Sequence, residues 1–285
     1  MFPIGVNTWV WESPLSDATL AELIPRIAGW GFDAVEIPME QADDIDAGRT
    51  AELLAAHGLA AVAVCAVTSA GRNLVAAPAR QIRDTQDYLR GCVDLAARLG
   101  AGSVGGPLYA EVGRTWRMDA AERATVYREL RENLAPVADY AGERGVRLAV
   151  EPLNRYETSV LNTVEQALTA LDGLPAETVG LMLDTYHLNI EERDLVTPVL
   201  AAGGRIAHVQ VCANDRGAPG ADHLDWPGFL AALTKTGYRG SICIESFTAH
   251  NDAIAVAASI WRPLAETQDA LAVDGLAFLR RIQAG

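Results

Sequence analysis

Four oxygen-bearing side chains stand at the ends of four apolar segments in the second half of the sequence. They are Glu151, Asp184, Gln210 and Glu245. Along each segment alternate residues form an apolar row, and the polar side chain belongs to the other row, as in a strand whose two faces differ. We therefore expect all four polar side chains to point to one interior, each from the carboxyl end of its strand.

The chemistry that this group of side chains can support is metal binding. Three carboxylates in a small volume raise one another's pKa values, and a divalent cation relieves that conflict. Because the four side chains offer only oxygen donors, they suit Mn²⁺ or Mg²⁺ better than Zn²⁺. The alternative for any one of them is a polar group that faces solvent. Four in register favour one divalent-metal site, with Mn²⁺ as the expected ion and Mg²⁺ or Co²⁺ as alternatives.

Such a site requires parallel, adjacent strands, and short β-rich runs do alternate with longer helical patterns along the chain. The runs predict strands near residues 3–9, 33–37, 60–65, 102–105, 147–151, 179–184, 205–211 and 240–245. The longer patterns predict helices near residues 16–30, 47–57, 79–99, 119–144, 161–172, 192–202, 226–236 and 268–283.

Eight strand-then-helix units predict an α/β fold in which a parallel sheet closes into a (β/α)₈ TIM barrel. The alternative is an open doubly wound sheet, but no GxGxxG motif opens a helix after the first strand. No linker or low-complexity stretch divides the chain, so we expect residues 1–285 to form a single barrel domain. Barrel enzymes carry their active sites at the carboxyl ends of the strands, where the four side chains are expected.

The amino-acid composition indicates which classes of partner the protein can bind and in which cell compartment it is found. The 285 residues carry a formal charge of −14 and a sequence pI of about 4.7, which would repel a nucleic acid. No apolar run approaches the roughly 18 residues that span a bilayer, and the N-terminus lacks the pattern of a signal peptide. The four cysteines show no CxxC motif and are expected to be reduced. We expect a cytoplasmic protein that binds a small molecule and neither nucleic acid nor membrane.

Several segments resemble one enzyme family. They are EPLNRYETSVLNT (151–163), LMLDTYHLNIEE (181–192), HVQVCANDRGAPG (208–220), ICIESF (242–247), GVNTWV (5–10), GFDAVEIP (31–38), GGPLY (105–109) and IWRPLA (260–265). These segments are similar to those of the ketose 3-epimerases, the D-tagatose and D-allulose 3-epimerase family of the xylose-isomerase-like TIM barrels. The resemblance implies an isomerase of carbohydrate metabolism that epimerises C3 of a free ketose, and a homo-oligomer, either a dimer or a tetramer.

The resemblance also implies roles for matching residues. Glu151 and Glu245 match an acid/base pair that ligates the metal as well. One glutamate removes the C3 proton, and the other returns a proton to the opposite face through a cis-enediolate. Glu157, His187 and Arg216 match residues around the O1–O2 end of the substrate.

Each of these three substrate contacts has a plainer alternative. Glu157 could be a charge at a helix N-terminus. His187 could be a hydrogen-bonded wall residue without a chemical part. Arg216 could form an ion pair with Asp215 or Asp222 on a loop.

One position departs from the family pattern. The family's fourth ligand is a histidine, and Gln210 stands in its place. His208 shares the parity of Gln210 but would lie about 6.6 Å deeper, so we take Gln210 as the ligand. Hydroxypyruvate isomerases, on the same barrel, are similar in using a glutamine there. The departure leaves other reactions open on the same metal site: those of an aldose–ketose or hydroxypyruvate-type isomerase, or of a 3-oxo-glycoside eliminase.

Four further residues are expected near the substrate. Trp9 and Trp116 fall at strand ends or on the loops that follow, where aromatic rings often stack on sugars, although ordinary packing is the alternative. Cys65 ends the third strand and is a candidate for the floor of the substrate site, although a role as buried filler is favoured. Glu36 has inward parity and is expected either to support the ligands or to contact the substrate.

Two functions from other classes can be weighed against the enzyme. Endonuclease IV shares this barrel, but it needs more histidine ligands for three zinc ions and a basic groove. Five histidines and a net charge of −14 argue against it. A non-catalytic sugar-binding barrel could dispense with the two glutamates, which this chain keeps.

Overall fold

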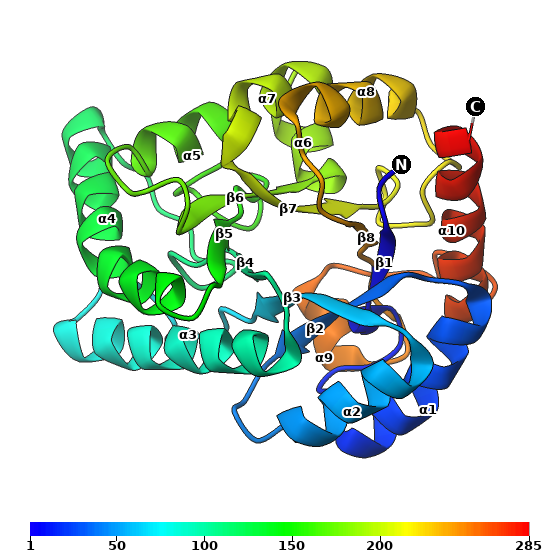
Figure 1. The fold of residues 1–285 in the computed structure, drawn as a ribbon. Coiled ribbons are helices and arrows are strands. Elements are labelled where there is room, and N and C mark those ends of the chain that lie inside the picture. The colour runs from blue at the N-terminus through cyan, green and yellow to red at the C-terminus, as the bar shows by residue number, and fades with distance from the viewer. Residues whose placement is uncertain (285) are drawn as a thin grey trace.

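The computed structural model describes residues 1–284. Eight parallel strands pair in sequence order and close into a barrel, because β8 pairs with β1 (Figure 1). The strands are β1 Ile4–Asn7, β2 Ala34–Met39, β3 Ala60–Ala66, β4 Ser103–Gly106, β5 Arg147–Val150, β6 Val179–Asp184, β7 Ile206–Val211 and β8 Ile242–Ile244. The predicted (β/α)₈ barrel is confirmed.

A ring of helices surrounds the barrel (Figure 1). The α-helices are α1 Asp17–Trp30, α2 Ala47–His57, α3 Ala79–Leu99, α4 Ala120–Gly142, α5 Val164–Ala170, α6 Thr185–Glu191, α7 Val196–Ala202, α8 Trp226–Thr236, α9 Asp252–Ala257 and α10 Gln268–Ala284. Two 3₁₀ turns, η1 Thr8–Val10 and η2 Gly203–Arg205, complete the described elements. Six helices end at a glycine or within a few residues of one just before a strand; Gly31 and Gly58, for example, take up the left-handed conformation that caps a helix.

The structure contains short helices that the sequence did not predict. The first strand stops at Asn7, whose side chain accepts a hydrogen bond from the Trp9 backbone at 2.9 Å and turns the chain into η1. Likewise Asp184, the last residue of β6, caps α6 by accepting a hydrogen bond from the Tyr186 backbone at 2.9 Å. With seven residues in α6 and six in α9, neither helix is long enough to show a helical period in the sequence.

Inside the barrel, several glycines of the strands lie directly against atoms of neighbouring strands. A Cβ atom at Gly105 would lie 2.5 Å from the sulfur of Met182, and one at Gly5 would lie 2.6 Å from that of Cys243. At Gly180 a Cβ would come within 2.4 Å of the backbone oxygen of Arg205. A backbone atom cannot move aside as a flexible side chain can, so Gly180 is required for β6 and β7 to pack at this distance.

Replacing Gly180 with alanine should therefore destabilise the barrel. We expect Gly180→Ala to cost about 1–3 kcal/mol, the usual result of overpacking a core. Chemical denaturation, followed by the shift in midpoint, measures the cost. Gly29→Ala is the matched control, since a Cβ at Gly29 in α1 meets nothing within 4 Å; an unchanged midpoint for Gly180→Ala would contradict the packing argument.

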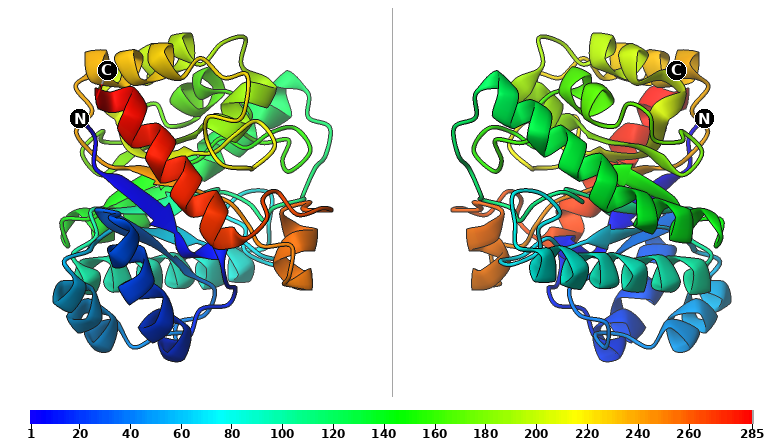
Figure 2. Two further views of the ribbon diagram at one scale, coloured as in Figure 1. Left: turned by 90° about the vertical axis from the view of Figure 1, so that its right-hand side faces the viewer. Right: turned by 90° about the vertical axis from the view of Figure 1, so that its left-hand side faces the viewer.

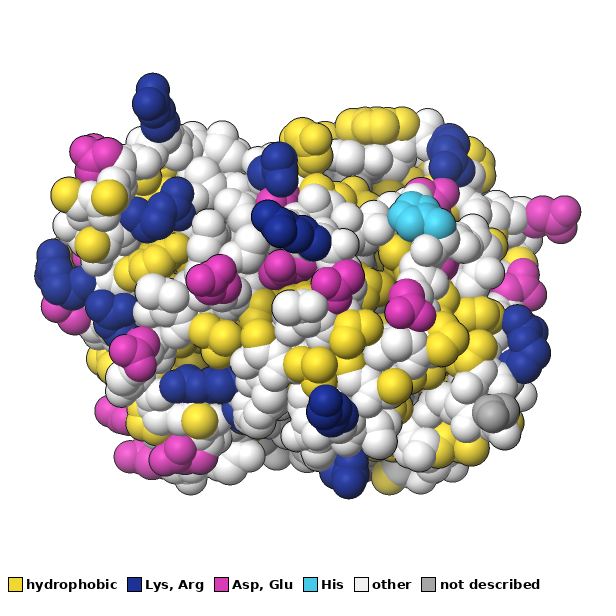
Figure 3. Space-filling view, turned by 90° about the horizontal axis from the view of Figure 1, so that it is seen from above, with side chains coloured by type: hydrophobic (Ala, Val, Ile, Leu, Met, Phe, Trp, Pro, Cys, Tyr) yellow, Lys and Arg dark blue, Asp and Glu magenta, His cyan; other side chains and the backbone are white. Residues whose placement is uncertain are grey.

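The described residues contain no helix long and apolar enough to cross a bilayer. The face in Figure 3 carries acidic, basic and apolar side chains interspersed with one another. All four cysteines are free and buried, as their apolar surroundings in the sequence predict.

Candidate active site

A cavity of about 480 Å³ lies at the carboxyl ends of the strands. Its polar lining includes Glu151, His187, Arg216 and Glu245. Residues of α9 and the segment after it complete the wall, and Figure 2 shows α9 projecting from the barrel outside the ring of helices. The cavity lies where the predicted site was expected, and α9 adds a wall that the sequence did not indicate.

Arg216 joins two of the predicted metal ligands. Its Nη1 donates to Asp184 Oδ2 at 2.5 Å and to Glu245 Oε2 at 2.7 Å. The Arg216 backbone has φ +70°, a conformation that non-glycine residues rarely adopt. Ser246 Oγ donates to the Arg216 carbonyl at 2.6 Å and helps to hold that conformation. Such strain persists only where surrounding contacts fix it, as is common at functional sites.

His187 lies between Glu151, the third predicted ligand, and Asp184. Its Nε2 lies 3.6 Å from Glu151 Oε1 and 3.7 Å from Asp184 Oδ2. Its Nδ1 accepts a hydrogen bond from the Asn154 backbone at 3.0 Å. A backbone N–H can only donate, so Nδ1 is an acceptor, and Arg216 Nη2, which also can only donate, lies 3.1 Å from Nε2. These carboxylates and His187 are close enough to form a metal-binding group.

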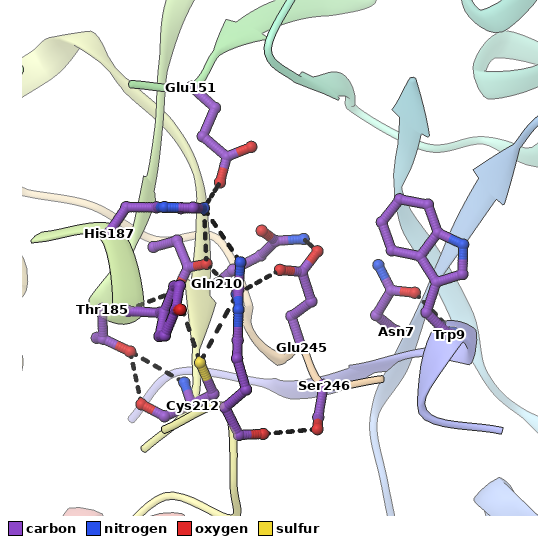
Figure 4. A network of polar contacts seen from close by, with 12 residues as sticks. Asn7, Trp9, Glu151, Thr185, His187, Gln210, Cys212, Glu245 and Ser246 are labelled. Carbon is purple, nitrogen blue, oxygen red and sulfur yellow. Dashed lines mark hydrogen bonds and ion pairs between the residues drawn. The ribbon is translucent and has the colours of Figure 1, made fainter. Parts of the chain in front are cut away.

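Gln210 is the fourth predicted ligand, and its amide nitrogen and oxygen have different surroundings. Nε2 donates to Glu245 Oε1 at 2.7 Å (Figure 4) and also to Glu36 Oε2 at 2.9 Å. Among the described residues, Oε1 is buried and has no hydrogen-bond partner. A buried polar atom without a partner is costly and calls for a ligand. Three carboxyl groups together with the unsatisfied amide oxygen of Gln210 fit a hard divalent cation.

The ionisation of the carboxyl groups reflects their burial and their neighbours. Burial raises the pKa of Glu245 to about 8, although Arg216 opposes the rise. Burial, followed by the charges of Glu245 and Asp184, places the pKa of Glu151 well above its ordinary value. For Asp184 burial acts in the same direction, but Arg216 and His187 outweigh it and lower the pKa. One carboxylate is therefore ionised while two glutamates favour the protonated form.

Comparison with known proteins identifies the family. A family model described as xylose isomerase-like TIM barrel matches residues 24–282. A probable ketose 3-epimerase of Synechocystis sp. is 32% identical over 277 residues, which cover 97% of this chain and 95% of the relative. The chain belongs to the ketose 3-epimerases of this barrel family. It is therefore an isomerase that acts on carbohydrates.

Other ketose 3-epimerases match over nearly the whole chain. An L-ribulose 3-epimerase of Methylomonas sp. is 31% identical, with 97% of this chain and 96% of the relative covered. The crystal structure of a D-allulose 3-epimerase from Methylomonas sp. in complex with D-allulose has 30% identity and a TM-score of 0.88, covering 98% and 96% of the two chains. These matches confirm the family that the sequence segments resemble.

The structure decides between the alternative roles that the sequence left open for Arg216 and Glu157. Arg216 pairs with Asp184 and Glu245, not with Asp215 or Asp222. Glu157 lies on the loop between β5 and α5, before the first turn of α5, where it lines the cavity and accepts a hydrogen bond from Asn154 Nδ2 at 2.7 Å.

Two residues predicted to contact the substrate are not among the residues that line this cavity. Trp116 faces a separate depression beside α4, with the Arg114 guanidinium 4.7 Å from the centre of its ring. The loop from β4 to α4 carries it there, and no local pattern predicts the path of such a loop. Cys65 lies below the lining of the cavity, buried against Asn7 Nδ2 at 3.5 Å. Of the aromatic residues considered, Trp9 does line the cavity.

The epimerase site also contains residues that sequence reasoning passed over. Tyr186 and Phe247 flank Arg216, whose guanidinium carbon lies 4.1 Å and 5.2 Å from their ring centres. Ser246 holds the Arg216 backbone. All three lie one or two residues after a predicted ligand, Asp184 or Glu245, in segments that resemble the family, and this position was the available signal.

Proposed function

We propose that the chain epimerises C3 of a free ketose, with Glu151 and Glu245 as the acid/base pair and one divalent metal, Mn²⁺ being the expected ion. The observation that carries this proposal is the pair of buried glutamates that face one cavity from the ends of β5 and β8. The pKa of Glu245, which burial raises to about 8, supports it, since an acid/base catalyst works best with a pKa near the working pH.

The four predicted ligands are proposed to hold the metal. They are Glu151, Asp184, Gln210 and Glu245. The unsatisfied Gln210 oxygen and the oxygen-only donor set support this assignment. When bound, the metal would act as a Lewis acid on the substrate carbonyl.

The protein groups supply the proton transfers. Strands β6 and β7 separate β5 from β8, so Glu151 and Glu245 approach the cavity from different sides. One glutamate takes the proton from C3, and the other returns a proton to the opposite face. The Arg216 guanidinium is a donor that can hold the oxygen on which negative charge develops, and His187, beside it in the cavity wall, can help to position that oxygen.

The cavity suits an unphosphorylated sugar. Among the described lining residues, Arg216 is the only lysine or arginine, and both its terminal nitrogens already contact Asp184, Glu245 or His187. A phosphate would need further donors, such as a second cation or a free helix N-terminus.

Incubation in D₂O with a panel of ketoses tests the function. With Mn²⁺ present, we expect deuterium at C3 of free ketoses such as D-allulose and L-ribulose, together with their C3 epimers, and little turnover of a ketose phosphate. Exchange at C1 would instead favour an aldose–ketose isomerase. No exchange on any ketose, with the metal still bound, would contradict the proposed reaction.

A further inference from the structure

A buried carboxylate lies beneath the proposed metal ligands. Glu36, in β2, is fully buried and accepts three side-chain hydrogen bonds. Asn7 Nδ2 and Gln210 Nε2 each donate to Oε2 at 2.9 Å, and His208 Nε2 lies 2.7 Å from Oε1. Three strands, β1, β2 and β7, are thus joined through one side chain across the barrel interior.

The hydrogen-bond geometry makes Glu36 Oε2 an acceptor. This oxygen lies 2.9 Å from both Asn7 Nδ2 and Gln210 Nε2, and an amide nitrogen can only donate. The side of Gln210 that faces Glu36 must therefore be its NH₂ group.

The orientation of the Gln210 amide follows from its two acidic neighbours. Both hydrogens of Nε2 are used, one toward Glu36 Oε2 and one toward Glu245 Oε1. A flipped amide would place its carbonyl oxygen against Glu36 Oε2, which already accepts a hydrogen bond from Asn7 Nδ2 and would repel it. Only the observed orientation leaves Oε1 free of protein partners in the described part of the chain. The amide oxygen is the atom with which glutamine ligates a hard cation.

We propose that Glu36 is a positioning residue, which, anchored by His208, orients the Gln210 amide so that its oxygen serves as the metal donor. The inference rests on the proposed metal site and adds a role for a residue that touches neither metal nor substrate. Outer partners that orient a ligand typically change metal affinity by roughly 10- to 100-fold when they are removed. The neutral amide of Glu36→Gln offers both a donor and an acceptor, so the orientation of Gln210 would no longer be determined.

A double-mutant cycle of metal affinities tests this role. The protein is stripped with EDTA, and Mn²⁺ binding is titrated calorimetrically for wild type, Glu36→Gln, Gln210→Leu and the double variant. We expect Glu36→Gln to weaken Mn²⁺ binding roughly 10- to 100-fold. In the Gln210→Leu background, the same change should have almost no further effect. Glu40→Gln is the matched control: Glu40 follows β2, pairs with Ser13 and does not contact Gln210.

The other possible results of the double-mutant cycle would overturn either the inference or the proposed function. An equal loss in both backgrounds would show that Glu36 acts through its charge alone and would overturn the inference. An unchanged affinity in Glu36→Gln, with Gln210→Leu impaired, would overturn it while leaving the proposed metal site intact. Failure of wild type to bind Mn²⁺ would contradict the proposed function itself. If Glu36→Gln does not fold, His208→Gln, which releases the other carboxylate oxygen, should give a smaller loss that also disappears with Gln210→Leu.

Discussion

Glu245→Gln is expected to lower the epimerisation rate at saturating Mn²⁺ by roughly 10²- to 10⁴-fold, the usual contribution of a general acid or base. The change keeps the shape of a buried side chain that is 4% exposed and keeps one oxygen for the metal. It removes the group that takes or returns a proton on one face of C3. The loss should therefore appear in kcat more than in the affinity for the ketose.

Deuterium exchange separates this role from a structural one. With one glutamate removed, the other can still take the proton from its own face and return deuterium to that same face. Glu245→Gln should then exchange C3 of one epimer without inverting it, and Glu151→Gln should do the same with the other epimer. Glu143→Gln, on a side chain that is 76% exposed, is the control for loss of a charge. Unchanged turnover in Glu245→Gln would contradict the acid/base assignment.

Removal of the metal with EDTA is expected to abolish turnover, and Mn²⁺ is expected to restore it better than Zn²⁺. The reason is the donor set, since amide and carboxylate oxygens suit hard cations. Gln210→His introduces an imidazole and should shift the preference toward Co²⁺ and Zn²⁺. Rates after adding back each ion to the stripped protein measure both effects. Full activity in the stripped protein, confirmed to be free of metal, would contradict metal dependence.

The affinity for Mn²⁺ should increase as the pH rises. A metal ligand must be deprotonated, and the pKa of Glu245 is raised to about 8 by burial. Between pH 5 and about 8, Mn²⁺ must displace its proton, so affinity should rise roughly tenfold per pH unit for each proton released. Calorimetry in buffers of different ionisation enthalpy counts the protons.

The contribution of Glu245 to the stability of the metal-free protein should decrease as the pH rises. The raised pKa of Glu245 means that the folded state binds the proton more tightly than the unfolded state, whose pKa is near 4.5. This contribution is fully present below pH 4.5 and is lost as pH rises to about 8. The increase in melting temperature on adding Mn²⁺ should therefore be larger at pH 8 than at pH 5.

Strand parity placed much of the site correctly. The period of two in β6 and β7 predicted inward side chains for Asp184 and Gln210, and in the register these residues are paired neighbours. Glu245 follows β8 with the same inward parity, and its Oε1 accepts from Gln210 Nε2. Parity works here because the barrel leaves each strand only two faces, one toward the helices and one toward the interior.

Strand parity does not predict the positions of loops and short helices. Trp116 was expected at the substrate and instead faces another depression, because the long loop after β4 has no period that fixes its path. The α9 wall of the cavity was not foreseen, since one short helix leaves no periodic signal.

The sequence by itself determined the barrel, the strand ends that carry polar oxygens, and the family, because these depend on periodicity and on local segments. Only the tertiary structure decided how the side chains meet. Arg216 lies between Asp184 and Glu245, and the Gln210 amide is oriented by Glu36 from a strand 174 residues away in the chain. Such contacts depend on barrel closure and on the competition of each donor for buried acceptors, neither of which is encoded in a local pattern.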